Sequence, residues 1–224
     1  GSWVAWSYQE SRDPEDFAPH VTLDDEAYSE LECARIALTR EDVTRFYKKF
    51  SKEAFWPIIF SFPGKAQFDE EDWEHYVEIN EIFARRTAEE AEEGALVWIH
   101  DYNLWLVPGF LRQMRPDLDI AFFHHTAFPP PDIFNIIPWR KEIVSSLLQC
   151  DYVGFHIPRY VQNFVEIARS HTPVEVTETA TCAPRFLTYG TAMGVDDMVN
   201  ELDVGERRAR LATTPVRSNA EAIR

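Results

Sequence analysis

Three short runs of apolar residues, each ending in polar side chains, divide the middle of the chain. They are "ALVWIHD", "LDIAFFHH" and "CDYVGFHI", at residues 95–101, 118–125 and 150–157. A continuous apolar run of this length is typical of a strand buried on both faces. Residues with helical spacing follow each run, at 103–117, 136–149 and 159–171. This alternation predicts an α/β fold, a Rossmann-like parallel sheet with helices on both faces and right-handed crossovers.

The first hundred residues contain two more predicted strands and two predicted helices. "SWVAWS" (residues 2–7) is strand-like, but no earlier element is available to pair with it, and residues 31–38 alternate large apolar residues with polar or small ones. Thr39 can cap a helix that begins at Arg40, with Asp42 as its capping-box partner. Residues 69–93 predict an acidic amphipathic helix that ends at Gly94.

Three segments have weaker patterns. Residues 12–30 are acidic and contain prolines, which predicts a surface loop. "RFLTYGTAMGV" (residues 185–195) reads as a strand and its exit, and residues 205–224 resemble a surface helix or incomplete structure. No internal repeat interrupts this plan.

Composition limits the class of protein and its partners. The chain has 224 residues, of which 45% are hydrophobic, so it can bury one sizeable core. No apolar run approaches the ~20 residues of a membrane span, and no signal peptide is recognisable. The net charge of −16 disfavours nucleic acid and anionic membranes as partners. Three widely spaced cysteines, Cys33, Cys150 and Cys182, indicate reduced thiols in a cytoplasmic protein.

Candidate chemistry gathers where the predicted strands end. The polar residues at these ends are His100, Asp101 and Tyr102 after the first run, His124, His125 and Thr126 after the second, and His156 after the third. Ligands of an open parallel sheet bind at the carboxyl ends of its strands, which predicts that these side chains line one crevice. A single histidine at a strand end is more often a hydrogen-bonded structural residue.

Other site types are disfavoured by the spacing of the residues. His100, Asp101, His125 and His156 are suitable metal ligands, but they form no HExxH or HxH pattern, and no metal is expected. The chain also has no GxSxG, GxGxxG or P-loop motif.

A second candidate set is aromatic. Trp6, Tyr47 and Trp56 offer faces on which sugar rings can stack, although any one of them is more often a core residue. The flanking lysines can attract a phosphate or form a solvated helix face, and these are Lys48, Lys49 and Lys52.

Three linked motifs carry a family resemblance. "VWIHDYNLWLVPGFLR", "IAFFHHTAFPPPDIFNIIPWR" and "LLQCDYVGFHIPRYVQNFV", in this order, resemble the N-terminal domain of the trehalose-6-phosphate synthase family of retaining glycosyltransferases, family 20. The resemblance is greatest to its glucosylglycerol-phosphate synthase branch, because Asn103 and His124 replace the second His and the Leu of the usual HDYHL and FFLHIPFP motifs. Ala127 departs from the usual proline.

The resemblance implies a GT-B fold and a specific reaction. Glucose would pass from ADP-glucose to sn-glycerol 3-phosphate with retention, giving a precursor of a compatible solute, with no cofactor beyond the nucleotide sugar. Asp101 matches the carboxylate that contacts acceptor hydroxyls, and His125 matches the histidine beside the donor glucose. The implied substrate-binding residues are Trp6, Tyr47, Trp56, Tyr102 and His124.

The resemblance also implies an incomplete enzyme. Residues 1–205 match an acceptor-binding domain without its first strand and glycine-rich loop, and residues 206–224 match the lead-in to an absent C-terminal nucleotide-sugar domain. Residues 1–224 alone are therefore expected not to turn over substrate. Two alternatives stay open, a trehalose-6-phosphate synthase and a non-catalytic binding domain of the same family.

Overall fold

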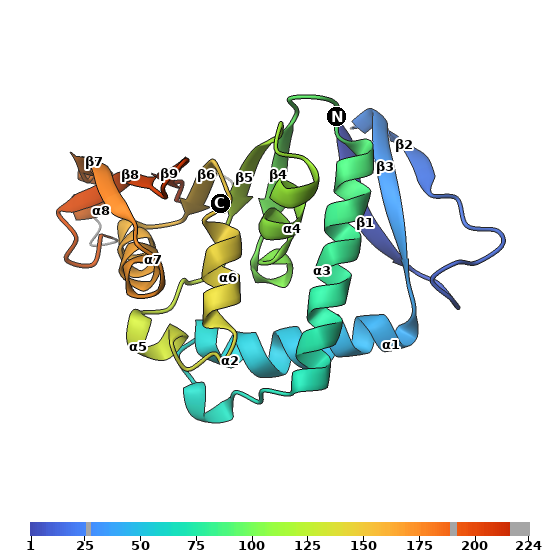
Figure 1. The fold of residues 1–224 in the computed structure, drawn as a ribbon, viewed down its shortest axis with the longest axis horizontal. Coiled ribbons are helices and arrows are strands. Elements are labelled where there is room, and N and C mark those ends of the chain that lie inside the picture. Colours follow the sequence, from blue (N-terminus) through green and yellow to red (C-terminus); the bar gives the residue numbers. More distant parts are fainter. Residues whose placement is uncertain (26–27, 189–191, 216–224) are drawn as a thin grey trace, which may run out of the picture.

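The computed structural model describes residues 1–25, 28–188 and 192–215, whose strands form two sheets. In Figure 1 the strands follow one another across the molecule, from β7 at one side to β2 at the other. The smaller sheet has the order β1-β3-β2 and the larger sheet the order β4-β5-β6-β9-β8-β7. The elements, in chain order, are β1 (Ser2–Tyr8), β2 (His20–Asp25), β3 (Tyr28–Leu38), α1 (Arg40–Asp42), the π-helix η1 (Val43–Phe55), α2 (Trp56–Ile59), the 3₁₀-helix η2 (Pro63–Lys65), α3 (Glu70–Glu90), β4 (Leu96–His100), the 3₁₀-helix η3 (Tyr102–Leu104), α4 (Val107–Met114), β5 (Asp119–Phe123), α5 (Pro131–Phe134), α6 (Arg140–Leu147), β6 (Tyr152–Phe155), α7 (Pro158–His171), β7 (Glu175–Thr181), α8 (Pro184–Thr188), β8 (Asp197–Asp203) and β9 (Arg208–Thr213).

The α/β fold class predicted from the alternation of strands and helices is confirmed. Strands β4, β5, β6 and β9 are parallel. Helices connect β4 to β5 and β5 to β6, whereas the connection from β6 to β9 includes α7, β7, α8 and β8. β8 and β7 extend the sheet in antiparallel fashion. The parallel strands therefore bring the loops that follow them to one edge of the sheet.

The burial of the central strands differs from the prediction of cover on both faces. Ile120, Phe122 and Val153 are at most 2% exposed, whereas Trp98 is 62% and Tyr152 42% exposed. The buried side chains join one core cluster with α3, α4, α6 and α7. Among the described residues these helices cover one face of the sheet, and the opposite face of β4 and β6 is open. A continuous apolar run does not reveal this, because both faces of the strand are apolar.

The predicted surface loop at residues 12–30 contains a strand. β2 pairs with β3 in antiparallel fashion, and β1 pairs with the other side of β3 in parallel fashion. The prolines and acidic residues concealed β2 because an edge strand of this kind is held by its backbone hydrogen bonds. β1 thus has a partner that follows it in the chain.

The predicted capping box at the first helix is confirmed. The Asp42 N–H donates to Thr39 Oγ1 at 3.2 Å, and the Thr39 N–H donates to Asp42 Oδ2 at 2.8 Å. The helix continues from α1 through η1 and then α2 to Ile59. Phe46, Phe50 and Phe55 bury one side of it against the core.

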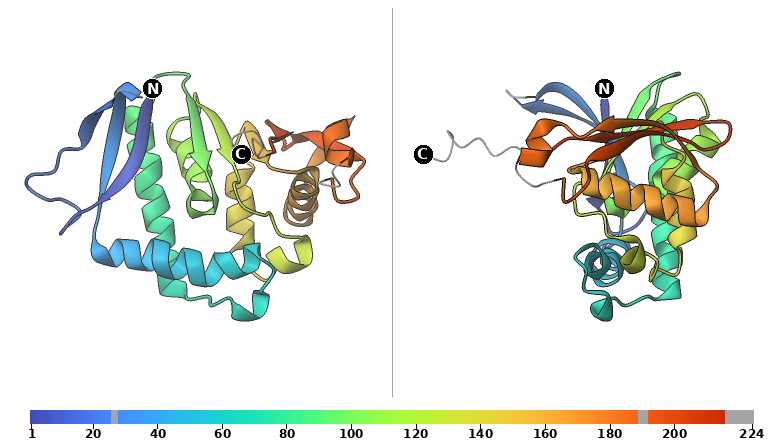
Figure 2. Two further views of the ribbon diagram at one scale, coloured as in Figure 1. Left: turned by 180° about the vertical axis from the view of Figure 1, so that it is seen from behind. Right: turned by 90° about the vertical axis from the view of Figure 1, so that its left-hand side faces the viewer.

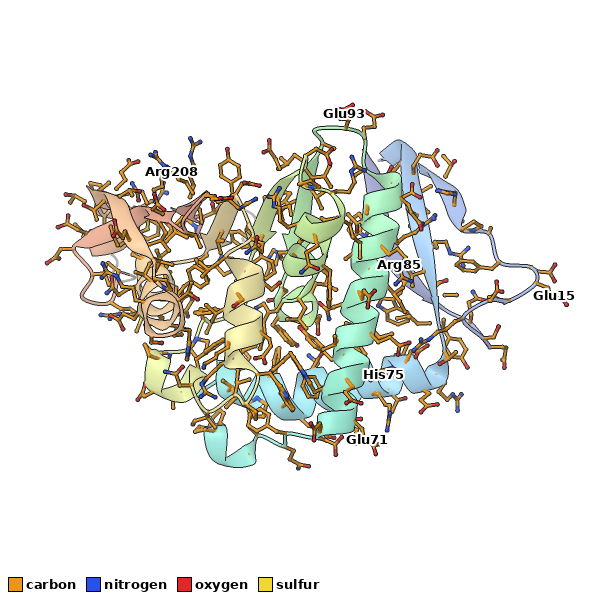
Figure 3. All side chains as sticks on the ribbon, in the orientation of Figure 1. Glu15, Glu71, His75, Arg85, Glu93 and Arg208 are labelled. Carbon is orange, nitrogen blue, oxygen red and sulfur yellow. The ribbon has the colours of Figure 1, made fainter. Side chains whose placement is uncertain are left out.

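The loop between β1 and β2 is attached to the helices by Arg12. Its guanidinium donates to the carboxylates of Asp42 and Glu78, and His75 Nε2 lies 3.1 Å from Asp42 Oδ1. Burial alone would raise the pKa of Asp42, but the hydrogen bonds from Arg12 and Thr39 outweigh it and lower this pKa to about 2. Figure 3 shows the loop projecting as far as Glu15, while His75 on α3 lies beside α1.

The secondary structure of the C-terminal part of the chain differs from the prediction. α8 occupies residues of the predicted strand at 185–195, while residues 189–191 lie outside the described part. β9 forms where a surface helix was expected, and it lies between β6 and β8. Its residues, 208–213, fall in the segment 206–224 that was predicted to lead into a second domain, and that lead-in stays a prediction.

The remaining compositional expectations concern thiols and membranes. Cys33, Cys150 and Cys182 are all free thiols, in agreement with the prediction. In residues 1–25, 28–188 and 192–215, no helix combines the length and the apolar character needed to cross a bilayer.

Candidate active site

A cavity of about 260 Å³ lies between the two sheets. Four consecutive residues of β1 line it, so the cavity runs along the edge of this strand rather than over one face. β1 and β4 are terminal strands of their sheets, and the left view of Figure 2 shows them next to one another with α3 behind. The full lining is Trp3, Val4, Ala5, Trp6, Phe46, Tyr47, Phe83, His100, Asn103 and Leu104.

The predicted histidines meet in a row across the carboxyl ends of the parallel strands. His100 Nδ1 lies 2.9 Å from His125 Nε2, and His156 Nε2 lies 2.9 Å from the His125 carbonyl oxygen. Burial and the neighbouring His125 lower the pKa of His100. A hydrogen bond between these two nitrogens needs one of them to donate and the other to accept, so the contact fixes the orientation of both rings.

His156 connects two strand ends through its ring. Its Nδ1 lies 3.0 Å from the Thr214 carbonyl oxygen, in addition to the contact of Nε2 with the carbonyl of His125. Both partners are backbone carbonyl oxygens, which only accept hydrogen bonds. His156 thereby connects the loop after β5 with the chain after β9.

Asp101 has a strained backbone at the end of β4. Its φ is 65° and its ψ 171°, a region that residues other than glycine rarely occupy and that costs on the order of 1–3 kcal/mol. Its N–H donates to the Phe123 carbonyl oxygen at 2.9 Å, and its Oδ1 accepts from Thr126 Oγ1 at 3.3 Å. Strain of this kind clusters at functional sites, where the surrounding structure maintains it. Asp101 is the predicted site residue with the most constrained geometry.

The structure separates His124 from its neighbour His125. His125 is exposed, whereas His124 is 0% exposed and its ring lies among Trp105, Phe128 and Phe155. Burial, opposed by the charge of Asp101, lowers the pKa of His124 to about 4. Its prediction as a substrate-binding residue is at odds with this burial, because a side chain without exposed surface meets no substrate. His124 instead supports the loop, with Nδ1 3.0 Å from the Thr126 carbonyl oxygen.

Two of the three predicted aromatic residues line the cavity, and Trp56 is not among its lining residues. Trp6 and Tyr47 line it and are 37% and 38% exposed. Trp56 is also 37% exposed, and its ring centroid lies 5.9 Å from that of Tyr102. Tyr102 is 2% exposed, and burial raises its pKa. Trp6, Tyr47 and Trp56 therefore offer surface to a ligand, whereas the Tyr102 ring serves mainly as their support.

Metal binding finds no support in the geometry of the described part of the chain. No group of three or more His, Cys, Asp or Glu side chains is arranged there to hold an ion. The strand-end imidazoles contact one another and backbone carbonyls instead.

A family profile decides the relationship of this site to known proteins. The profile described as "Glycosyltransferase family 20" matches residues 1–224. The chain belongs to glycosyltransferase family 20. This membership confirms the resemblance carried by the three motifs.

Individual members of family 20 resemble the chain over its whole length. It is 54% identical over 224 residues to the glucosylglycerol-phosphate synthase of Pseudomonas anguilliseptica, of which it covers 30%. It is 36% identical over 216 residues, 96% of its own length, to the trehalose-6-phosphate synthase of Mycolicibacterium smegmatis, of which it covers 39%. The chain therefore spans less than half the length of these relatives.

A solved structure shows the same fold. The α,α-trehalose 6-phosphate synthase of Burkholderia multivorans matches all of this chain with a TM-score of 0.79 at 24% identity, and 43% of that protein is covered. The predicted GT-B relationship is thus confirmed at the level of fold.

One polar contact of this site joins two predicted strand-end residues, and another involves a residue that the sequence did not indicate. Thr126, predicted at the end of the second run, carries the hydroxyl that contacts Asp101, although this contact itself was not predicted. The Thr214 carbonyl oxygen, 3.0 Å from His156 Nδ1, was not predicted to take part in the site. The contact with Thr214 joins residues 58 apart in the chain and has no sequence signature.

Proposed function

We propose that the protein to which this chain belongs transfers glucose from ADP-glucose to sn-glycerol 3-phosphate, with retention at the anomeric carbon, giving glucosylglycerol phosphate. One observation carries the choice of product. The chain is 54% identical to a glucosylglycerol-phosphate synthase and 36% identical to a trehalose-6-phosphate synthase, over nearly the same residues.

Asp101 is proposed to bind and orient the attacking hydroxyl of the acceptor. A carboxylate accepts a hydrogen bond from a hydroxyl, and that bond strengthens as the hydroxyl loses its proton in the transition state. The strained backbone of Asp101 and the hydrogen bond from Thr126 support this role, because both restrict the direction of the carboxylate.

His125 is proposed to bind the donor glucose. Its ring is exposed, and the contact between its Nε2 and His100 restricts its orientation. Transfer of a glucosyl group builds positive charge at the anomeric centre, and preoriented polar groups stabilise such charge best. Trp6, Tyr47 and Trp56 are proposed to contact the acceptor, and their exposed surface supports this.

The proposed domain arrangement includes a strand and a domain beyond the described residues. The free edges of β1 and β4 support an inserted parallel strand, which would join the two sheets across the cavity. Residues 1–205 would then form the acceptor-binding domain, and residues 206–224 would lead to the domain that binds the nucleotide sugar.

The experiment is a matrix of two donors and two acceptors with the full-length protein. Each of ADP-glucose and UDP-glucose is supplied with glycerol 3-phosphate or glucose 6-phosphate, and proton NMR identifies the product and its anomeric configuration. We expect the α-linked glucosylglycerol phosphate from ADP-glucose. Preferential use of glucose 6-phosphate would identify a trehalose-6-phosphate synthase, and binding without transfer would identify a non-catalytic domain.

The same assay tests residues 1–224 alone. We expect no release of ADP from ADP-glucose and glycerol 3-phosphate, since the proposed nucleotide-binding domain is missing. Measurable turnover by residues 1–224 would contradict the proposal that acceptor binding and nucleotide-sugar binding belong to two separate domains.

A further inference from the structure

Lys52 lies among three aromatic rings beside the cavity. Its Nζ is 3.9 Å from the ring centroid of Trp56, 5.5 Å from that of Tyr47 and 5.9 Å from that of Tyr102. The same ammonium donates to Tyr102 Oη at 3.2 Å. These contacts fix the position of a long, flexible side chain, because the ring faces attract a cation.

The charge of Lys52 is not neutralised by the described residues. No carboxylate in residues 1–25, 28–188 or 192–215 lies within 4.0 Å of its Nζ as an ion-pair partner, although the chain has 38 acidic residues. Lys49, three positions earlier, shows the contrast, since its Nζ is 2.6 Å from Asp72 Oδ2. The aromatic rings and the Tyr102 hydroxyl orient the ammonium group, but they carry no negative charge that would neutralise it. Two of its three N–H groups remain available to donate to a ligand.

An anionic oxygen is the ligand that completes such a site. An ammonium binds phosphate oxygens through charge-assisted hydrogen bonds, which are about twice as strong as neutral ones. Tyr47 lines the cavity, and Tyr102 directly follows Asp101, so the ammonium group belongs to the same region as the proposed acceptor site. The exposed faces of Tyr47 and Trp56 suit the C–H groups of a small polyol.

We propose that Lys52 binds the phosphate group of the acceptor and makes the site specific for phosphate monoesters of small polyols. This assignment rests on the proposed function and adds a specificity-determining residue to it. Tyr47, Trp56 and Tyr102 orient Lys52. The phosphate of the acceptor then forms the ion pair that no described carboxylate forms with Lys52.

The test is Lys52→Met in the full-length protein, assayed by steady-state kinetics. Methionine retains most of the apolar stem that packs on the rings and removes only the charged donor. We expect the KM for glycerol 3-phosphate to rise by about tenfold to a hundredfold, the loss typical of one hydrogen bond to a charged group. The KM for the nucleotide sugar stays within twofold.

Lys48→Met is the matched control. Lys48 is exposed on the same helix, and no ion pair links it to another described residue. This variant is expected to retain the acceptor KM of the unaltered protein. Calorimetric titration with glycerol and with inorganic phosphate separates the two parts of the ligand, since Lys52→Met weakens phosphate binding and leaves glycerol binding unchanged.

Each outcome supports or overturns the assignment. An acceptor KM within twofold of the unaltered protein overturns it, as does an equal change in the KM values of donor and acceptor, which indicates a structural role for Lys52. If the protein prefers glucose 6-phosphate, the proposed acceptor is wrong, and a raised KM for glucose 6-phosphate in Lys52→Met still supports the phosphate contact. Absence of binding of any phosphate monoester to the unaltered protein overturns both.

Discussion

Replacement of the buried His124 by leucine tests the consequence of enclosing an imidazole in an aromatic pocket. His124 Nδ1 faces the Thr126 carbonyl oxygen, while Nε2 is buried and forms no hydrogen bond with any residue that the structure describes. His124→Leu loses the hydrogen bond, which lowers the free energy of unfolding by about 1 kcal/mol. The substitution also removes the unpaired Nε2, whose burial costs about 1–3 kcal/mol. At pH 7 we therefore expect a net change of no more than about 2 kcal/mol in the free energy of unfolding.

The larger effect appears in acid. The pKa of His124 is about 4 in the folded chain and 6.5 for an unperturbed histidine. Between these values the unfolded chain binds more protons, so stability is complete above pH 6.5 and decreases as the pH falls toward 4. For these two values, His124 costs the protein about 2 kcal/mol of stability between pH 7 and pH 5. His124→Leu is free of this loss.

The assay is urea denaturation of both proteins at pH 7 and pH 5, followed by circular dichroism. All other titrating groups are common to the two proteins, so their contributions cancel in the difference between them. We expect that difference to shift by about 2 kcal/mol in favour of the variant at pH 5. Phe128→Leu, in the same pocket, is the control and retains the pH dependence of the unaltered protein. A difference that is the same at both pH values would refute the claim that burial keeps His124 neutral.

Three further substitutions test other contacts. Asp101→Gly is expected to be more stable than Asp101→Ala in thermal melts by about 1 kcal/mol or more, because glycine adopts a positive φ without strain; equal stability would contradict the strain. Thr126→Val is expected to lower kcat for transfer about tenfold, with Thr126→Ser restoring it, since only the hydroxyl contacts Asp101; an unchanged kcat would exclude this positioning role. Arg12→Met is expected to lower the free energy of unfolding by about 1–3 kcal/mol in urea titrations. It is also expected to unfold at higher pH during acid titration, because Asp42 loses the partner that lowers its pKa. An unchanged acid midpoint would contradict this.

Local signals in the sequence were sufficient for much of the fold. The capping box of Thr39 and Asp42, the helix α3 and the three strands β4, β5 and β6 were all predicted, because each depends on neighbouring residues. β2, β7 and β8 were not predicted. Polar residues interrupt the apolar pattern of each of them, and their pairing depends on backbone hydrogen bonds to other strands.

The candidate site was predictable as a region but not as a set of contacts. The strand ends correctly indicated that His100, His125 and His156 lie together. The pair "HH" in the sequence could not show that His124 turns inward and His125 outward, because alternation along the chain continues past the end of β5. The bonds from Thr126 and Lys52 depend on side-chain directions that only the folded chain determines.

The unpaired edges of β1 and β4 determine how residues 1–224 behave in isolation. Among the described residues no strand lies opposite either edge, and neither β1 nor β4 carries an Asp, Glu, Lys or Arg side chain that would repel another copy. The net charge of −16 therefore comes from residues outside these two strands. Concentrated solutions of this chain are therefore prone to aggregation through β-strand pairing between molecules, and short peptides that cap both edges would reduce it.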